Sequence, residues 1–181
     1  MKKRIAIIGS GIAGLTLGNL LLTNSEFEFV IYEKNNILDL NEGFGIQLSV
    51  NSIYVLNKIG FSQLNANEKY HPTQLDFYSI NFDKICDLNL EIFNLENEKY
   101  TTLKRSTLIK FLKEKLLSNS IIFRKQVNKV EKNNGKINIS FTDGSNDEVD
   151  FLIVSDGVFS NTKSILEKKF FKPKYYGAIA I

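Results

Sequence analysis

Near its N-terminus the chain carries a GxGxxG pattern, formed by Gly9, Gly11 and Gly14. Gly9 permits a tight turn, Gly11 lets a pyrophosphate approach the backbone, and Gly14 allows a helix to pack closely on a strand. The amides of Ile12 and Ala13 lie in the first turn of that helix. They would face the phosphates together with the positive end of the helix dipole. By itself the pattern also fits a tight strand-to-helix turn that binds no ligand.

An acidic residue, Glu33, ends the next apolar run about 20 residues further on, where a carboxylate can accept hydrogen bonds from both hydroxyls of a ribose. Its spacing from the glycines favours a nucleotide site over an empty turn. A negative charge here argues against a 2′-phosphate on the bound nucleotide, because like charges would meet. The adjacent Lys34 is a further candidate contact. An NAD-dependent Rossmann oxidoreductase would explain these first residues equally well.

The elements that must position these residues follow from apolar periodicity. A strand over 3–8, a helix over 12–23 and a strand over 27–33 form a βαβ unit, whose strands should be parallel and whose crossover should be right-handed. Both strands are almost continuously apolar, which indicates a sheet covered on both faces. The sequence therefore predicts an α/β fold with a Rossmann-like start.

The remaining segments predict helices and antiparallel strands. A helix over 51–59 ends before Gly60, and an amphipathic helix covers 106–117. Alternation of apolar and polar residues predicts an antiparallel pair of strands over 75–80 and 85–90, with one face exposed to solvent. Three strands over 121–130, 136–142 and 148–154 form a β-meander, because the turns between them contain Asn-Gly and Asp-Gly.

Three further segments resemble the class A flavoprotein aromatic hydroxylases, the FAD-dependent monooxygenases related to para-hydroxybenzoate, salicylate and polyprenyl-phenol hydroxylases. Residues 43–49 (GFGIQLS) are similar to the family's G-x-G-I-x-L, although Val50 and Ser52 replace a proline and an alanine that usually follow. Arg105 and Leu108 match R-x-x-L. Residues 155–160 (SDGVFS) resemble A-D-G-x-x-S, but Lys163 stands where the family has arginine.

The resemblance implies a Rossmann-like FAD-binding domain of the GR2 type over residues 1–181, in which about 70–100 and 172–181 begin the sheet of the substrate domain. It implies that Arg105 reaches the flavin cofactor, since a guanidinium fork suits phosphate or ribityl oxygens better than an ammonium does. Lys163 keeps the charge of the usual arginine without its fork. Besides the residues of the first two motifs, the implied cofactor contacts are Gly45, Gln47, Arg105, Val127, Asp156 and Gly157.

Composition excludes several other classes of function. The 23 basic residues nearly balance the 20 acidic ones, which does not favour nucleic acid as a partner. One cysteine and one histidine are too few for a zinc site, and we expect no metal. Apolar runs are too short to span a bilayer. We expect a cytoplasmic protein, with peripheral membrane association if the substrate is a polyprenyl phenol.

The function implied by the resemblance is hydroxylation of an aromatic or polyprenyl-phenol substrate, with NAD(P)H as electron donor to FAD and O2 as oxidant. No catalytic base is evident. The family pattern continues beyond the motifs found here, so we expect the N-terminal half of such an enzyme, with the strand over 175–181 broken off. The chain alone would then not hydroxylate. A non-catalytic nucleotide-binding fragment, or one half of a split enzyme completed by a second chain, is the alternative.

Overall fold

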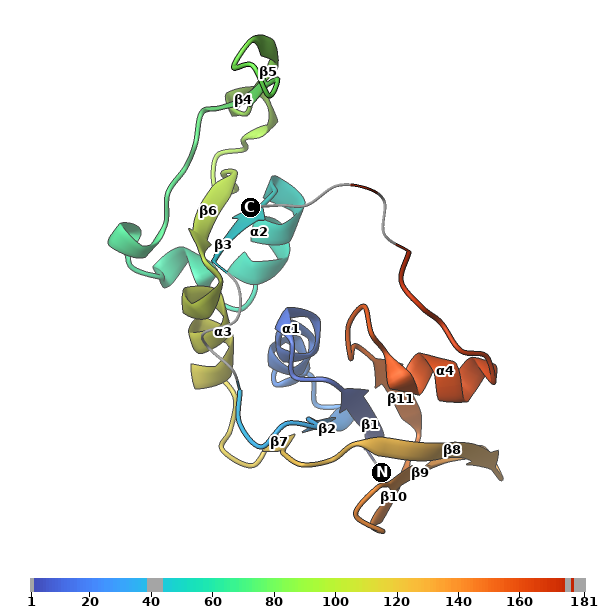
Figure 1. The fold of residues 1–181 in the computed structure, drawn as a ribbon. Coiled ribbons are helices and arrows are strands. Elements are labelled where there is room, and N and C mark those ends of the chain that lie inside the picture. The colour runs from blue at the N-terminus through green and yellow to red at the C-terminus, as the bar shows by residue number, and fades with distance from the viewer. Residues whose placement is uncertain (1, 39–43, 175–176, 178–181) are drawn as a thin grey trace. The chain divides into compact units, whose positions relative to one another are not determined.

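A computed structural model describes residues 2–38, 44–174 and 177 (Figure 1). The chain divides into two compact units. The first unit comprises Met1–Leu38 with Lys115–Ile181, and the second comprises Asp39–Glu114. The predicted strand over 175–181 lies outside the described residues apart from Gly177, and so does Gly43.

The first unit is built on a parallel sheet with the strand order β11-β1-β2-β7. Helix α1 connects β1 to β2 and packs on both strands, which confirms the predicted βαβ start (Figure 1). The elements of this layer are β1 (Lys3–Ile8), α1 (Ile12–Leu21), β2 (Phe27–Tyr32), β7 (Ile121–Ile122) and β11 (Phe151–Val154).

An antiparallel meander with the order β10-β9-β8 completes the first unit, as the sequence predicts. Its turns place Asn134, Gly135 and Gly144 at positive φ, the conformation that Asn-Gly and Asp-Gly turns adopt. These elements are β8 (Val127–Asn133), β9 (Lys136–Phe141) and β10 (Asn146–Val149), and they are followed after β11 by α4 (Asn161–Glu167).

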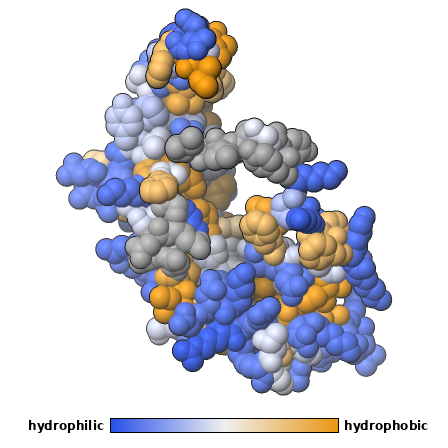
Figure 2. Space-filling model, in the orientation of Figure 1, coloured by the Kyte–Doolittle hydropathy of each residue, from blue (hydrophilic) through white to orange (hydrophobic). Residues whose placement is uncertain are grey.

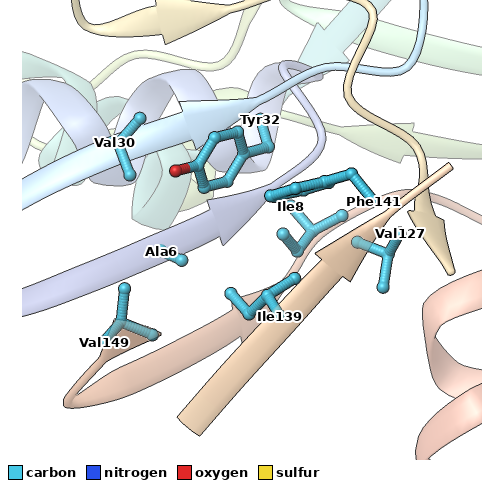
Figure 3. Packing of buried hydrophobic residues seen from close by; sticks show 8 residues of the cluster. All are labelled: Ala6, Ile8, Val30, Tyr32, Val127, Ile139, Phe141 and Val149. Atoms are coloured by element: carbon cyan, nitrogen blue, oxygen red, sulfur yellow. The ribbon is translucent and has the colours of Figure 1, made fainter. Parts of the chain in front are cut away.

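Apolar side chains of the meander pack on the face of the parallel sheet opposite α1. Gly18 of α1 approaches Phe29 and Ile31, whereas the alternate residues Val30 and Tyr32 belong to the core shared with the meander. The sheet is therefore covered on both faces, as its apolar strands predict. Figure 3 shows eight members of this core, namely Ala6, Ile8, Val30, Tyr32, Val127, Ile139, Phe141 and Val149.

Two of the predicted meander strands each divide into two. The segment 121–130 breaks near Arg124, whose φ is +60°, so that β7 joins the parallel sheet and β8 the meander. The segment 148–154 breaks at Asp150, whose carboxylate accepts the Arg4 amide at 2.8 Å. The predicted helix over 12–23 ends earlier, at Leu21, and α4 was not predicted.

The second unit contains two antiparallel strand pairs and two helices. Strand β3 pairs with β6, and β4 pairs with β5 as the sequence predicts. Strand β6 was not predicted. The elements are β3 (Gly45–Leu48), α2 (Val50–Asn57), the short 3-10 turns η1 (Phe61–Gln63), η2 (Ala66–Glu68) and η3 (Glu91–Phe93), β4 (Gln74–Tyr78), β5 (Lys84–Asn89), β6 (Thr101–Lys104) and α3 (Arg105–Glu114).

Helix α3 has a buried apolar side. Leu108, Ile109 and Leu112 are buried, and the ring of Phe111 lies edge-on to that of Phe61 with centroids 5.6 Å apart. Leu48 of β3 and Leu103 of β6 are also buried. Strand β6 runs directly into α3, which places the β3–β6 pair next to the first turn of this helix.

The β4–β5 hairpin presents apolar side chains to solvent, and hydrophobic surface appears on it in Figure 2. In the observed register Leu75 is opposite Leu88 and Phe77 is opposite Cys86, so these four residues share one face. The other face carries Asp76 and Asp87, both paired with Lys84. The predicted antiparallel pair is confirmed, but the expectation that only one of its faces meets solvent is wrong, because Phe77 is 48% exposed and Leu88 is 38% exposed.

Candidate functional site

The glycine turn between β1 and α1 has no room for side chains at two of its three glycines. Gly9 has a φ of +101°, and a Cβ there would lie 2.6 Å from the carbonyl oxygen of Ser155. A Cβ on Gly14 would lie 2.0 Å from the carbonyl oxygen of Gly9. The structure therefore confirms the tight turn and the close helix-to-strand packing inferred from these residues.

Gly11 differs from the other two because its surroundings are open. A Cβ added there would meet no atom of the described residues within 4 Å, and its φ of −71° is accessible to any residue. Gly11 is the N-cap of α1, and no acidic residue lies in the first turn. The amide groups of this turn, which include those of Ile12 and Ala13, lie at the positive end of a ten-residue helix. An anionic ligand could approach the backbone here.

Glu33 lies at the glycine turn, directly after β2. It is 8% exposed, and its Oε2 accepts hydrogen bonds from the Ser10 amide at 3.0 Å and from the Ser10 hydroxyl at 2.6 Å. The amide of Asn35 donates to the other oxygen, Oε1, at 2.9 Å. The structure thus brings the predicted acidic residue to the predicted phosphate-binding turn. Sequence reasoning missed Ser10, whose only signal was a hydroxyl inside the glycine pattern.

Two weaker candidates, Lys34 and Val127, occupy different environments. Lys34 is exposed beside Glu33. Val127 is 3% exposed, and its carbonyl accepts from the Asn161 side chain at 3.3 Å. The segment before it runs along the end of β2, since the Lys125 amide donates to the Glu33 carbonyl at 2.8 Å. The side chain of Val127 therefore belongs to the core, and any contact with a ligand would have to come from its backbone.

Asp156 and Gly157 form a turn that touches the glycine turn. A Cβ on Gly9 would lie 2.8 Å from the Cα of Asp156. The Asp156 carboxylate accepts from the Ser160 hydroxyl and from the Thr162 amide, so it holds the first turn of α4. Gly157 has a φ of +85° and is exposed.

Next to this turn lies a hollow of about 340 Å³. Lys163, which stands in place of the family's arginine, contributes to its lining, and its ammonium lies 4.2 Å from the centroid of the Phe171 ring. A cation over an aromatic face is attracted by the ring quadrupole. The lining residues are Val154, Asp156, Gly157, Ser160, Lys163, Leu166 and Glu167.

In the second unit the β3–β6 pair brings together the other three candidates. Gly45 is opposite Lys104, and the Arg105 amide donates to the Phe44 carbonyl at 2.9 Å. Gln47 is exposed on β3, and its Oε1 accepts from the Tyr100 hydroxyl at 2.9 Å. Arg105 is half-buried as the first residue of α3. The candidates therefore form one group in each unit.

A cavity of about 810 Å³ lies beside the second group. Burial lowers the pKa of the Lys69 ammonium, which lies on the lining and approaches the Ser62 carbonyl at 3.2 Å. Nothing in the sequence pattern around Lys69 predicts that this residue lies at a cavity. The lining residues are Phe44, Gly45, Asn67, Glu68, Lys69, Tyr70, Thr102, Leu103, Lys104, Ser106 and Thr107.

Within the described ranges, no group of three or more His, Cys, Asp or Glu side chains could hold a metal ion. No helix among these residues is long and apolar enough to cross a membrane.

Comparisons with known proteins point to one class of enzyme. The chain is 27% identical over 184 residues to 6-hydroxynicotinate 3-monooxygenase of Bordetella bronchiseptica, covering 99% of this chain and 47% of that enzyme. It is 26% identical over 178 residues to the FAD-dependent monooxygenase anuJ of Penicillium roqueforti, covering 89% of this chain and 21% of that enzyme. No family model matches.

Among solved structures, 2,6-dihydroxypyridine-3-hydroxylase from Arthrobacter nicotinovorans aligns with a TM-score of 0.77 at 18% identity, covering 98% of this chain and 42% of that one. This likeness confirms the α/β fold. The sequence matches confirm the resemblance to FAD-dependent monooxygenases. The chain spans about half the length, or less, of the curated relatives it matches.

Proposed function

We propose that the chain forms the nucleotide-binding, N-terminal part of an FAD-dependent monooxygenase that hydroxylates an aromatic ring with NAD(P)H and O2. The observation that carries the proposal is the open backbone at Gly11 next to the buried Glu33. The homologues supply the class of reaction, because they are monooxygenases that match almost the whole chain.

The residues of the first unit fit the ADP portion of FAD. The amides that begin α1 are free of acidic neighbours in the first turn and would bind the pyrophosphate. Glu33 would accept from the adenosine ribose, and its negative charge would repel a 2′-phosphate. The closeness of Asp156 to Gly9 supports a role for the Asp156-Gly157 turn in the same binding region.

The residues of the second unit supply groups that suit other parts of the cofactor. Arg105 offers a guanidinium fork at the start of α3, and Gly45 and Gln47 lie on the strand paired with the residues before it. A guanidinium matches phosphate or ribityl oxygens with two parallel hydrogen bonds. We assign Arg105, Gly45 and Gln47 to FAD on this basis and on the resemblance.

When bound, FAD would take electrons from NAD(P)H and make O2 reactive toward an electron-rich ring. The described residues would position the cofactor through the adenosine ribose and the pyrophosphate. We assign no residue here as a base or as a substrate contact. The named relatives act on 6-hydroxynicotinate and 2,6-dihydroxypyridine, which supports a small hydroxylated aromatic substrate. A polyprenyl phenol remains the alternative substrate from the sequence.

The cellular setting is part of the proposal. The single cysteine, Cys86, is exposed and unpaired by any disulfide, in keeping with a reducing cytoplasmic compartment. If the enzyme consists of two chains, a second polypeptide equivalent to the C-terminal half of the relatives would be its partner.

The test is to purify the 181-residue chain, incubate it with FAD, remove free flavin and record the visible spectrum. Retained flavin absorption supports the proposal. A colourless chain that binds NAD with a measurable affinity would instead favour an NAD-dependent oxidoreductase. A chain that retains FAD but, joined to the C-terminal half of a relative, never oxidises NAD(P)H would favour the non-catalytic alternative.

A further inference from the structure

The carboxylate of Glu33 already accepts three hydrogen bonds from its own chain. Two of the donors belong to Ser10, whose amide and hydroxyl both point at Oε2, at 3.0 and 2.6 Å. The third is the Asn35 amide, at 2.9 Å from Oε1. Ser10 is 2% exposed and Glu33 is 8% exposed, so the two bonds between them are shielded from water.

An ionised carboxylate has about four positions at which it can accept a hydrogen bond, two on each oxygen. Both positions on Oε2 are taken by Ser10, and one position on Oε1 is taken by Asn35. Among the residues that the structure describes, no other group donates to this carboxylate, so one position, on Oε1, is left. A ribose offers two adjacent hydroxyls, so the expectation that Glu33 accepts from both does not fit this arrangement.

We propose that Ser10 determines specificity at the nucleotide site by restricting Glu33 to one of the two ribose hydroxyls. This inference rests on the proposed binding of the ADP portion of FAD. The Ser10 hydroxyl holds the place on Oε2 that the second ribose hydroxyl would take. Of the three donors, it alone comes from a side chain, so it alone can be removed by substitution without altering the backbone.

The Ser10→Ala variant should therefore change how many ribose hydroxyls bond to Glu33, and not only the affinity for the nucleotide. In the parent chain one ribose hydroxyl bonds to Glu33. In the variant, Oε2 gains a vacant acceptor position, and the second hydroxyl can occupy it. Loss of the Ser10 hydroxyl also removes a charge-assisted hydrogen bond from the ligand-free chain. The buried carboxylate of the variant therefore lacks one donor until ADP binds. ADP should then raise the unfolding temperature of Ser10→Ala by more than it raises that of the parent.

The experiment is isothermal titration of the 181-residue chain with ADP, 2′-deoxy-ADP and 3′-deoxy-ADP. We expect the parent to bind one deoxy analogue roughly tenfold or more weakly than ADP and the other within about twofold, since one hydrogen bond to a charged group is lost in one case only. Ser10→Ala should discriminate against both analogues by about tenfold and should bind ADP more tightly than the parent.

A matched control is Ser155→Ala, which removes a hydroxyl that contacts the glycine turn from the end of β11. Ser155 donates to the carbonyls of Ile8 and Gly9 and not to Glu33, so this variant should keep the parent's pattern across the analogues. Equal discrimination against both analogues by the parent would overturn the inference alone. Failure of the parent and both variants to bind ADP would overturn the proposed function and this inference with it.

Discussion

At the scale of the residue, Glu33 joins two functions in one side chain. Its carboxylate links the end of β2 to the glycine turn through Ser10, and it leaves one acceptor position toward a ligand. The spacing from Gly14 predicted the residue and its place. The bonds with Ser10 could not be predicted, because a serine inside GxGxxG has no fixed partner until β1 and β2 lie side by side.

Replacing Glu33 tests the ribose contact directly. Glu33→Gln keeps the size of the side chain but removes its charge, and we expect FAD binding to weaken by about 1.5–3 kcal/mol, the scale of a hydrogen bond to a charged group. The measurement is flavin fluorescence titration of the 181-residue chain. Thermal unfolding without ligand serves as the control, since Gln also changes the bonds to Ser10 and Asn35. An unchanged FAD affinity would show that Glu33 does not contribute to FAD binding.

Substitution of Arg105 tests whether FAD binding needs the two parallel hydrogen bonds of a guanidinium or only a positive charge. Arg105→Lys keeps the positive charge but cannot make two parallel hydrogen bonds, so we expect it to lose most of the FAD affinity that Arg105→Ala loses. The same fluorescence titration, with parent, Lys and Ala forms compared side by side, gives the result. If the lysine form binds as the parent does and the alanine form does not, Arg105 acts as a point charge.

At the scale of the element, two glycines of the turn between β1 and α1 have different roles. Gly14 is required for close packing, and Gly11 leaves the backbone open to a ligand. Gly14→Ala would place a Cβ 2.0 Å from the Gly9 carbonyl oxygen, and such overpacking costs about 1–3 kcal/mol or more. Gly11→Ala meets nothing within 4 Å and should cost about 1 kcal/mol or less, as a poorer N-cap. We expect Gly11→Ala to fold but to bind FAD more weakly, because its methyl group hinders the pyrophosphate.

Urea unfolding and FAD titration of the two glycine variants distinguish these effects. Gly14→Ala should show the larger loss of unfolding free energy. Gly11→Ala should show the larger loss of FAD affinity relative to its loss of stability. Should Gly11→Ala bind FAD like the parent, the phosphate would not approach the backbone at this position.

Asp150 connects β1 with the place where the chain leaves the meander for β11. Its carboxylate accepts the Arg4 amide at 2.8 Å and pairs with Lys136 at 2.9 Å and Lys3 at 3.5 Å. These donors lower the pKa of Asp150 to about 2. Because the pKa is lower in the folded chain, the carboxylate stabilises the fold above about pH 4. This contribution is lost as the pH falls toward 2.

Asp150→Asn should therefore unfold at lower urea concentration than the parent at neutral pH. The difference should shrink as the pH is lowered from about 4 to about 2, because the parent's carboxylate becomes protonated. Circular dichroism during urea unfolding at a series of pH values measures it. A difference that stays constant over this range would mean that the charge of Asp150 does not stabilise the fold.

Element prediction succeeded where periodicity was long and failed where the chain is interrupted locally. The βαβ start and the hairpin turns follow from apolar runs and from Asn-Gly and Asp-Gly. Strand β6 has four residues, too few for a periodic signal. The break before β8 depends on Arg124 at positive φ, which its residue type does not encode. Helix α4 is short, and it begins with Ser160 as N-cap and with the Asp156 carboxylate bonded to Ser160 and Thr162.

At the scale of the whole molecule, the described residues include many large apolar side chains that are exposed to solvent. The 43% hydrophobic share is ordinary for a globular protein. Nevertheless, one face of the β4–β5 hairpin presents Leu75, Phe77, Cys86 and Leu88, with Phe77 and Leu88 among the exposed large apolar residues. The curated relatives that match this chain are about twice as long or longer. Contiguous apolar surface of this kind on a folded chain usually marks a place of association.

We therefore predict that the 181-residue chain self-associates through this apolar face. Phe77→Thr with Leu88→Thr should weaken association severalfold or more, because both side chains lie on the same face of the hairpin and lose apolar area that association would bury. Tyr78→Thr is the matched control. Tyr78 is 54% exposed on the same strand, but its side chain points to the face opposite that of Phe77. Sedimentation velocity over a concentration series measures the effect, with circular dichroism to confirm that each variant folds. A parent chain that stays monomeric at high concentration would contradict the prediction, and equal weakening by Tyr78→Thr would place the contact elsewhere on the hairpin.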